Sequence, residues 1–436
     1  MVRSFALAFA LAAVATTPAA DHWPSWRGPT ANGVAPESAD PPTLWDADTN
    51  IKWKVPLPGR GSATPVVWGD RLFVLTAIPT DRAAKPEELP PAAPKFQTRT
   101  TPPTTFYKFD VLCLDRNTGK ELWRKTAAEA VPHEGHHKSH SYAAGSPATD
   151  GQRLYVSFGS FGVFAYDLDG KPLWKRDFGR MRTRLGWGEA VTPVVHGGSV
   201  ILNWDQEADS KLIVLDAATG ETKWEAKRAE KTSWNAPLVV THGDRTQVIV
   251  NATNRARAYD LAGGKVIWEV GGMTTNAIPS PLAADGVAYL MSGYGGAAAV
   301  AVPLDSTGDL GTAGEVNWRY GKGTPYVPSP VLYGGRLYFT QGNTGLLTVL
   351  DAKTGKVLTA GERLQKLTSL YASPLAAAGR IYFTDRTGTT VVLKAGDKPE
   401  VLAVNKLDDP IDASPVVVGK TLYLRGEKNL YAIEAK

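Results

Sequence analysis

The chain has 436 residues, a length that by itself would suggest two or three domains, and its 43 glycines and 31 prolines indicate many turns. With 48 basic against 43 acidic side chains, the net charge of +5 belongs to a mixed surface, which excludes the basic footprint of a nucleic-acid-binding protein. Cys113 is the only cysteine, so an intramolecular disulfide is excluded, and we expect Cys113 to be a small buried apolar residue.

Residues 1–20 have the features of a secretory signal peptide. The basic Arg3 precedes an apolar run from Phe5 to Val14, and small residues lead up to Asp21. The run is too short for an ordinary membrane span, so we expect cleavage and no transmembrane span afterwards; the alternative is an uncleaved N-terminal anchor. No cysteine follows the leader, which argues against a bacterial lipid anchor. The leader therefore predicts a periplasmic or secreted protein.

The next two segments are an irregular stretch and an isolated strand. Residues 21–50 have no strand or helix period, and we expect them to run over the fold before they enter it. Residues 51–57 read as a strand that carries Trp53 and has no hairpin partner nearby. From there to residue 436 we expect a single domain.

Eight repeats fill that domain, each with a small residue, a proline, a few apolar residues, a glycine turn and an apolar strand. A period in the forties with strand-like content is typical of a β-propeller with one four-stranded blade per repeat. In residues 328–359 we expect strands over 330–333, 336–340 and 346–350, and a fourth strand that begins at Val357. The repeat prolines are Pro65, Pro147, Pro193, Pro237, Pro281, Pro330, Pro374 and Pro415.

The first repeat is interrupted by a proline-rich insertion at residues 78–109. Proline lacks the backbone N–H that a strand donates to its neighbour, so we expect a long surface loop that does not pair in a sheet. A lid or docking arm and a neutral insertion both remain open.

The last repeat, from Ser414, has room for three strands before the chain ends. Pairing it with the isolated strand at 51–57 would close the ring and leave no long free edge. The sequence therefore predicts an all-β, eight-bladed β-propeller with four antiparallel strands per blade, in which the N-terminal strand completes the last blade.

Aromatic and polar residues gather just before the first strand of each repeat. The first strand of a propeller blade is the innermost, so these positions are expected to meet at one mouth of the central channel. Aromatic rings interleaved with a few polar groups suit a ligand pocket, and the alternative is that they fill the channel and bond the blades together. The candidates for a channel-mouth binding site are Arg60, His140, Tyr142, Trp187, Glu189, Trp234, Asn235, Asn276, Tyr326, Tyr371 and Asp412.

Two other clusters contain metal-ligating residue types. His133, His136, His137 and His140 lie near Glu134, but their spacing matches no closed zinc motif, and a solvated or substrate-facing loop is favoured. Asn203 to Asp209 carries three carboxylates that could bind Ca²⁺, but the twelve-residue calcium loop is missing, and an acidic surface turn is favoured. No GxSxG, phosphate-loop or HExxH motif is present.

The repeat, the tryptophan positions and the expected number of blades resemble those of the PQQ-like eight-bladed β-propellers. One branch of that family consists of quinoprotein alcohol dehydrogenases, which bind pyrroloquinoline quinone (PQQ) and calcium at the channel mouth. Another is the non-enzymatic propeller lipoprotein of the outer-membrane β-barrel assembly machinery. The chain is more closely similar to secreted PQQ-like repeat proteins abundant in planctomycetes. The phrases that carry this likeness are WPSWRGP (23–29), HEGHH (133–137), GWGE (186–189), NWDQEADS (203–210), NATNRARAYDL (251–261), GTPYVPSP (323–330) and LDDPIDASP (407–415).

The resemblance leaves more than one function open. The dehydrogenases carry adjacent cysteines over the quinone, and this chain has neither those nor a CxxCH haem site. We therefore expect a monomeric, non-catalytic binding or scaffold protein without a resident cofactor, whose partner is an envelope protein or an extracellular polymer. The alternative is a PQQ- and calcium-dependent oxidoreductase, in which Glu189, Asn276 (or Asn235) and Asp412 would imitate the calcium ligands of the dehydrogenases. A third reading is a carbohydrate-binding or carbohydrate-acting disc, because aromatic platforms suit sugar rings.

Overall fold

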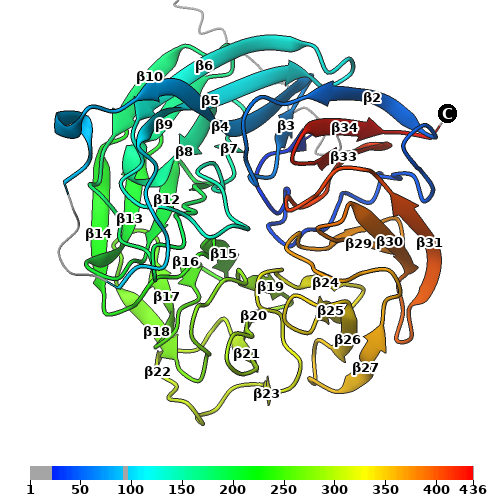
Figure 1. The fold of residues 1–436 in the computed structure, drawn as a ribbon. Coiled ribbons are helices and arrows are strands. Elements are labelled where there is room, and N and C mark those ends of the chain that lie inside the picture. The colour runs from blue at the N-terminus through cyan, green and yellow to red at the C-terminus, as the bar shows by residue number, and fades with distance from the viewer. Residues whose placement is uncertain (1–21, 92–96, 436) are drawn as a thin grey trace, which may run out of the picture.

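The protein was studied as a computed structural model that describes residues 22–91 and 97–435; the expected signal peptide at 1–20 lies outside them. The described residues form eight sheets that surround a central axis as the blades of a propeller (Figure 1). The predicted fold class is therefore confirmed. Within these residues, no helix is long and apolar enough to cross a membrane.

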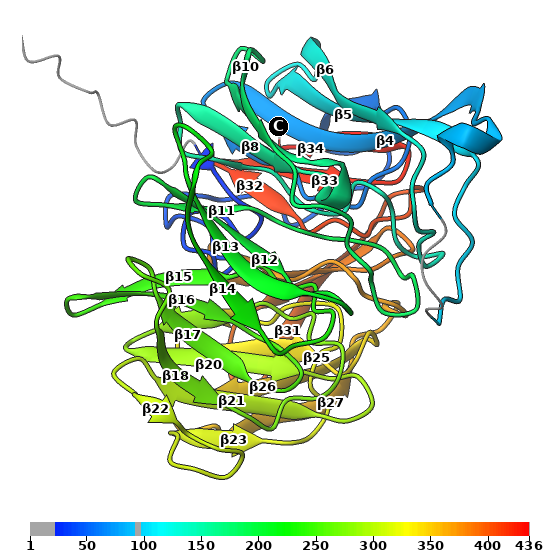
Figure 2. The same cartoon turned by 90° about the vertical axis from the view of Figure 1, so that its left-hand side faces the viewer.

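The chain winds once around the axis, and each blade runs from a short inner strand to an outer strand at the rim (Figures 1 and 2). Blade one consists of β1 (His22–Trp23), β3 (Val66–Trp68), β4 (Arg71–Ala83), β5 (Thr105–Asp115) and β6 (Glu121–Ala130). Blade two consists of β7 (Ala148–Thr149), β8 (Arg153–Ser157), β9 (Val163–Asp167) and β10 (Pro172–Arg176). Blade three consists of β11 (Val194–His196), β12 (Ser199–Trp204), β13 (Ser210–Asp216) and β14 (Thr222–Arg228). Blade four consists of β15 (Leu238–His242), β16 (Arg245–Val250), β17 (Ala256–Asp260), β18 (Val266–Val270) and the added β22 (Gly308–Asp309).

The second half of the ring repeats this order. Blade five consists of β19 (Leu282–Ala284), β20 (Val287–Ser292), β21 (Ala298–Pro303) and β23 (Trp318–Tyr320). Blade six consists of β24 (Val331–Tyr333), β25 (Arg336–Thr340), β26 (Leu346–Asp351) and β27 (Val357–Arg363), close to the strands predicted for 328–359. Blade seven consists of β28 (Leu375–Ala377), β29 (Arg380–Thr384), β30 (Thr389–Lys394) and β31 (Glu400–Lys406). Blade eight consists of β32 (Val416–Val418), β33 (Thr421–Arg425), β34 (Asn429–Ile433) and β2 (Ile51–Pro56). The 3-10 turns η2 (Pro86–Glu88) and η3 (Gly159–Phe161) lie in loops.

The ring closes as the sequence predicts. Strand β2 pairs antiparallel with β34, with Lys54 opposite Tyr431. Because β2 comes from the start of the chain and β34 from its end, this pairing joins the two ends of the propeller in one sheet.

The expected insertion at 78–109 is partly regular. Strands β4 and β5 continue into it, with Pro79 opposite Tyr107 and, after an irregularity, Ala83 opposite Thr105. The prediction that this stretch does not pair is therefore wrong at both ends. Pro79 lies beyond the end of β3, where β4 has a neighbour on one side only, and an edge position of this kind tolerates proline.

Tryptophans on the outer strands fasten neighbouring blades together. In five blades the indole N–H donates to a backbone carbonyl of the next blade, at 2.8 to 3.1 Å. A glycine with positive φ lies under each ring, and a Cβ there would come within 2.6 to 2.9 Å of the indole, so a larger residue does not fit. The pairs are Trp53 and Gly119, Trp123 and Gly170, Trp174 and Gly220, Trp224 and Gly264, and Trp318 and Gly355.

Blade seven obtains its tryptophan from elsewhere. Its outer strand has Ala403 where β6 has Trp123, each opposite the equivalent residue of the third strand. Trp45, from the segment before β2, packs in the same buried cluster and stacks on Tyr382 with a centroid distance of 6.4 Å. The N-terminal segment therefore supplies the ring that the repeat lacks.

A ring of side-chain hydrogen bonds, here called the inner ring, surrounds the channel. It is formed by the small residue before each repeat proline, whose hydroxyl accepts the backbone N–H of the equivalent residue in the preceding blade. The bonds run Thr64 to Ser146, Ser146 to Thr192, Ala236 to Ser280, Ser280 to Ser329, Ser329 to Ser373, Ser373 to Ser414 and Ser414 to Thr64, at 2.9 to 3.1 Å. The link from Thr192 to Ala236 is missing because alanine has no hydroxyl.

The described part of the irregular segment, residues 22–50, crosses the channel before the chain enters blade eight as β2. Strand β1 pairs with β3 of blade one. The buried Arg27 then donates to the carbonyls of Pro330 and Pro374, in blades six and seven, at 2.8 and 2.9 Å. Burial lowers the pKa of Arg27 to about 9. The crossing segment therefore ties opposite sides of the disc together and places Trp26 in the channel.

The hydrophobic core lies between the blades. Tyr338 of blade six, for example, packs in one cluster with Phe383 and Leu393 of blade seven. Cys113 on β5 is fully buried, as predicted.

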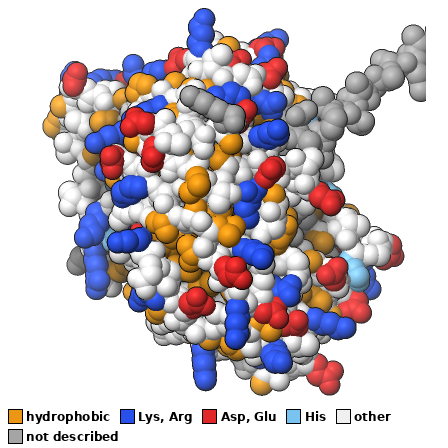
Figure 3. Space-filling view, turned by 90° about the vertical axis from the view of Figure 1, so that its right-hand side faces the viewer, with side chains coloured by type: hydrophobic (Ala, Val, Ile, Leu, Met, Phe, Trp, Pro, Cys, Tyr) orange, Lys and Arg blue, Asp and Glu red, His pale blue; other side chains and the backbone are white. Residues whose placement is uncertain are grey.

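Large apolar side chains remain exposed on the rim beside blade seven. Val401, Leu402 and Val404 lie on β31, and Leu44, which is 62% exposed, lies in the adjacent N-terminal segment. Figure 3 shows this side of the molecule, where hydrophobic side chains gather among charged ones. We refer to these four residues as the rim patch.

Candidate functional site

A cavity of about 390 Å³ lies in the channel where the loops before the inner strands meet. Six of the predicted channel-mouth residues line it: His140, Trp187, Trp234, Tyr326, Tyr371 and Asp412. Residues that the sequence analysis did not propose for the channel mouth also line it, among them Trp26, His137, Ser139 and Tyr294. We call this cavity the central pocket.

Aromatic rings form much of the wall of the central pocket. The rings of Trp187 and Trp234 are inclined at 28° with centroids 6.5 Å apart, and Tyr294 stands at 79° to Trp187. Tyr294 in turn lies 4.8 Å from Tyr326. The indole N–H of Trp234 donates to the carbonyl of Gly188 at 2.8 Å, which fixes that ring.

The loop that presents Trp187 depends on a close approach of backbone to side chain. Gly188 has a φ of 105°, and a Cβ there would lie 2.8 Å from Nδ1 of His140. Only glycine fits this position, so the GWGE phrase of the sequence sets the position of Trp187.

The polar side of the pocket is a chain of hydrogen-bonding groups. Nδ1 of His137 lies 2.6 Å from Oγ of Ser139, and that oxygen lies 3.0 Å from the phenol oxygen of Tyr371. The guanidinium of Arg386 lies over the Tyr371 ring at 4.4 Å and donates two hydrogen bonds to the carboxylate of Asp412, at 2.6 and 3.2 Å. Asp412 is therefore already paired with a cation.

Burial keeps the histidines of the pocket neutral. It lowers the pKa of His137, and it lowers the pKa of His140 to about 4, so neither imidazole is charged at neutral pH. Burial also raises the pKa of Asp412, an effect that its hydrogen bonds and charge contact with Arg386 oppose. Near pH 7 the pocket thus contains one carboxylate, balanced by one guanidinium, and no other net charge among its lining residues.

Glu189 and Tyr142 line a separate cavity of about 20 Å³, together with His133 and Glu134. The Glu189 carboxylate accepts hydrogen bonds from the backbone N–H and the hydroxyl of Ser160, at 2.6 and 2.7 Å, and lies 3.5 Å from Nε2 of His133. Burial raises the pKa of Glu189 to about 7, against the lowering effect of those bonds. We call this space the side cavity. Glu189 lines the side cavity and does not line the central pocket.

The remaining candidates lie outside the central pocket. Arg60 forms an ion pair with Glu427 at 2.9 Å beside a cavity of about 40 Å³ that shares Asp412 with the central pocket. Asn235 is buried, and its amide bonds the backbone of Asn251 at 2.7 and 3.2 Å, so it connects strands. Asn276, with a φ of 57°, is buried; its amide makes no hydrogen bond of ordinary geometry, although it affects the pKa of the Tyr326 phenol.

The three residues expected to imitate a calcium site are not brought to one cavity. Glu189 lies in the side cavity, Asp412 is paired with Arg386 at the central pocket, and Asn276 lines neither. Within residues 22–91 and 97–435, no group of three or more His, Cys, Asp and Glu side chains is placed to hold a metal ion. The donor set present here does not fit the calcium-bound quinone of the dehydrogenases. Cys113 does not line the central pocket either. It is buried in β5, and burial raises the pKa of its thiol to about 12.

The histidine-rich loop is divided between these spaces. His133 lines the side cavity, whereas His137 and His140 line the central pocket. His136 packs edge-on against Tyr142 at 4.6 Å. The favoured reading of this loop as substrate-facing remains a prediction for His137 and His140.

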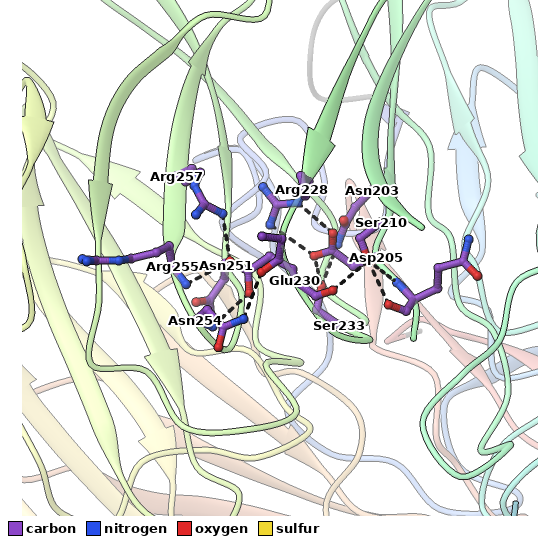
Figure 4. A network of polar contacts seen from close by, with 12 residues as sticks. Asn203, Asp205, Ser210, Arg228, Glu230, Ser233, Asn251, Asn254, Arg255 and Arg257 are labelled. Carbon is purple, nitrogen blue, oxygen red and sulfur yellow. Dashed lines mark hydrogen bonds and ion pairs between the residues drawn. The ribbon is translucent and has the colours of Figure 1, made fainter. Parts of the chain in front are cut away.

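The acidic stretch 203–209 is a surface turn only at its tip, where Ala208 and Asp209 are exposed, whereas Asp205 is buried. The side chains of Asp205 and Arg228 are fully buried and form a two-point ion pair at 2.7 and 3.1 Å, shown in Figure 4. Ser233 donates to the same carboxylate at 2.8 Å, and Arg228 donates to the phenol of Tyr259 in blade four at 2.6 Å. The pairing partner is an arginine of the next-but-one strand, a contact that the local sequence does not reveal.

The insertion approaches the loop that carries Trp187. The backbone N–H of Arg99 donates to the carbonyl of Leu185 at 2.8 Å, and the hydroxyl of Thr100 donates to the carbonyl of Gly186 at 2.6 Å. Residues 98–100 therefore brace the aromatic wall from outside; a role as lid or docking arm stays a prediction.

The chain is similar to one protein family in sequence and to several solved structures in fold. The profile of the family described as outer membrane protein assembly factor BamB matches residues 108–358. The crystal structure of BamB from Moraxella catarrhalis is similar with a TM-score of 0.53 and 14% identity, over 83% of this chain and 98% of that chain. A europium-containing methanol dehydrogenase is similar with a TM-score of 0.64 and 11% identity, over 95% of this chain and 98% of that chain.

The quinohemoprotein alcohol dehydrogenase ADHIIG from Pseudomonas putida HK5 has a TM-score of 0.60 and 12% identity, over 95% of this chain and 80% of that chain. Identities this low show a common fold and no more. A comparison with curated proteins gave no significant match.

Proposed function

Because the chain belongs to the family of the outer membrane protein assembly factor BamB, whose members are PQQ-like β-propellers, we propose that it is a non-catalytic binding protein. The observation that carries this proposal is the central pocket, where aromatic side chains from several blades converge with a few polar groups. The same geometry suits the capture of part of a partner, an envelope protein or an extracellular polymer. We propose no resident cofactor for it.

A quinoprotein function is the competing proposal, and the fold likeness to a methanol dehydrogenase and to a quinohemoprotein alcohol dehydrogenase supports it. The donor set counts against it, because Glu189, Asn276 and Asp412 do not share a cavity. When bound, PQQ with calcium would supply hydride-accepting chemistry.

A titration separates the two proposals. Purified protein is titrated with PQQ and Ca²⁺ while the quinone absorbance and the midpoint of thermal unfolding are followed. A ligand present at a hundred times its Kd stabilises the folded state by about 2.7 kcal/mol. We expect no change in either signal; saturable quinone binding with alcohol-dependent dye reduction would replace the binding function by the oxidoreductase.

The binding function itself is tested by capture of partners from envelope extract and from extracellular polymer. We expect Trp187→Ala and Tyr326→Ala to reduce recovery of the partner, because both rings line the central pocket. Val404→Glu, in the rim patch, is the matched control. Recovery that depends on Val404 and not on Trp187 or Tyr326 would move the interface from the channel to the rim.

We further propose that residues 1–20 direct export to the periplasm or the medium and that the mature protein is a monomer. N-terminal sequencing of the protein recovered from those fractions, together with its mass by sedimentation, tests both points. A retained leader or a concentration-dependent mass would contradict them.

A further inference from the structure

The hydrogen-bonding groups of the central pocket can donate as well as accept. The Ser139 hydroxyl stands between Nδ1 of His137 and the Tyr371 phenol, at 2.6 and 3.0 Å. Ser62 and Ser141 form a second hydroxyl pair at 3.1 Å beside it. A hydroxyl, a phenol and a neutral imidazole each offer both roles, so they match a ligand whose own groups are hydroxyls. A carboxylate ligand would need donors only, and an ammonium ligand would need acceptors only.

The charges around the pocket point in the same direction. Asp412 is bound at two points by Arg386, and Arg60 in the adjoining cavity is paired with Glu427. Among the lining residues of the central pocket Asp412 is the one charged side chain, and Arg425 of the adjoining cavity is held by the carbonyls of Ala63 and Leu75. A phosphate or another strong anion would have to break one of these pairs, which favours a neutral ligand.

The aromatic wall suits an apolar face on that ligand. Trp187, Trp234, Tyr294 and Tyr326 form a continuous set of rings with centroid distances of 4.8 to 6.5 Å. The electron-rich face of such a ring attracts the partially positive C–H groups that a pyranose presents on one side. The same rings could surround a quaternary ammonium. However, a cation beside these rings would find no free carboxylate, because Asp412 is already bound by Arg386.

The dimensions of the pocket fit a small part of a larger molecule. Its volume of about 390 Å³ lies at the lower end of the roughly 300–1,000 Å³ that is typical of small-molecule sites. Trp26 of the segment that crosses the channel forms part of its lining, so the channel is obstructed beside the pocket. A ligand of this size is one or two sugar rings, such as the end of a polysaccharide chain.

We propose that the central pocket binds neutral carbohydrate, with a pyranose stacked on the Trp187 and Trp234 wall and its hydroxyls bonded by Ser139, His137 and Tyr371. This rests on the proposed binding function and narrows its partner to a polymer.

The test uses the exported protein and a panel of neutral sugars: malto-, cello-, laminari-, xylo- and chitohexaose, each with its monosaccharide. Binding is followed by tryptophan fluorescence and by calorimetry. We expect at least one hexasaccharide to bind and to quench fluorescence. Binding of the hexasaccharide alone indicates recognition of polymer, and equal binding of the monosaccharide indicates recognition of free sugar.

Variants assign the binding to the pocket. Trp187→Ala should weaken binding by about tenfold or more, as expected for a central aromatic contact. Ser139→Ala should weaken it through loss of the hydroxyl chain, and Leu44→Ala, on the rim patch, should leave it unchanged. Since Trp187→Ala could disturb the loop, Trp187→Phe, which keeps an aromatic face, should recover part of the affinity.

Three outcomes would overturn the proposal. The first is that no sugar of the panel binds at a concentration of about 10 mM, where even weak recognition is detected. The second is that tetramethylammonium or inorganic phosphate binds at the pocket instead. The third is that sugar binds equally well to the Trp187→Ala variant. If sugar fails to bind while a protein partner is still captured through Trp187, the carbohydrate proposal fails and the binding function stands. Saturable quinone binding in the titration with PQQ and Ca²⁺ would overturn both the carbohydrate proposal and the proposed binding function.

Discussion

The junction between blades three and four differs from the other seven junctions of the ring. Elsewhere the residue before the repeat proline donates its backbone N–H to a hydroxyl of the next blade, and the seven bonds are nearly equal in length, at 2.9 to 3.1 Å. At this junction Ala236 offers no hydroxyl to Thr192. The inner ring is open there, although the propeller is closed.

Polar side chains further from the axis replace the missing bond. Asn203 of blade three donates to Ser233 and to the carbonyl of Asn235, both in the loop that leads into blade four, at 3.0 and 3.1 Å. Arg228 pairs with Asp205 (Figure 4) and also donates to the phenol of Tyr259 across the same junction. Neighbouring blades are thus held either by one repeated neutral hydrogen bond or by a buried, charged network, and we expect the two kinds of junction to respond differently to mutation.

The largest effect is expected when the buried ion pair is broken. Asp205→Asn leaves the fully buried Arg228 without its counter-charge, and removal of one partner of such a pair costs about 3–5 kcal/mol. Urea unfolding followed by tryptophan fluorescence measures the loss. Asp169→Asn is the control, because Asp169 pairs with Arg71 at the surface and is 78% exposed, where a pair contributes about 0–1 kcal/mol. Similar losses in the two variants would mean that burial of the pair is not what matters.

A second effect, on the pH dependence of stability, concerns Glu189, a buried carboxylate that is not paired with an arginine. Glu189 joins blades two and three through Ser160, and burial raises its pKa from 4.5 to about 7. Because its folded pKa lies above its unfolded pKa, its contribution to stability is complete below about pH 4.5 and is lost as the pH rises to 7. The loss amounts to about 3 kcal/mol between these limits. His133, whose pKa burial lowers, titrates with the opposite sign.

The comparison of wild type with Glu189→Gln isolates the pH-dependent contribution of Glu189 to the free energy of unfolding. Between pH 5 and 7.5, the free energy of unfolding of the wild type should fall relative to that of the variant, since glutamine does not titrate. Denaturation at several pH values measures the difference. Glu225→Gln, at the exposed pair with Lys211, should keep the wild-type slope. A constant difference between wild type and Glu189→Gln across this range would show that Glu189 is not responsible.

A regular link of the inner ring should matter less. Ser329→Ala removes the acceptor for the backbone N–H of Ser280, at 2.9 Å, and leaves that buried donor unpaired. The expected cost is about 1–2 kcal/mol, which is smaller than that of Asp205→Asn. Thermal and urea unfolding of Ser329→Ala and Asp205→Asn in parallel give the ratio of their losses in unfolding free energy. A cost for Ser329→Ala as large as that for Asp205→Asn would make the ring, and not the charged network, the main fastening.

The sequence predicted the regular features and missed the irregular ones for a physical reason. The repeat prolines, the glycine turns and the strand around Trp53 are local patterns, and each follows from residues close together in the chain. The pairing of Asp205 with Arg228 and the replacement at Ala403 by Trp45 depend on residues brought together only by folding. A run of carboxylates therefore reads as an exposed turn until its partner is known.

The same limit applies to the candidate site. Convergence of loops on the channel was predictable from the blade order, and six proposed residues line the central pocket. Position along the loop does not say toward which cavity a side chain turns, so Glu189 was grouped with residues from which it is separated. Trp26 lies in the WPSW phrase at 23–26, whose path through the channel is fixed by Arg27 and not by any strand pattern.

The smallest effect is the most direct test of the comparison, because it repairs the open link. Ala236→Ser gives the ring its missing acceptor for the Thr192 N–H, and one such bond contributes about 0.5–1 kcal/mol. For a chain of this size that gain corresponds to a rise in Tm of about 1 °C. Ala413→Ser, one residue before Ser414 and also buried, adds a hydroxyl without an inner-ring donor and should destabilise. If Ala236→Ser destabilises as Ala413→Ser does, the gap at Ala236 is required by the packing around Asn203 and Ser233, and the charged network is the cause of the open link and not its compensation.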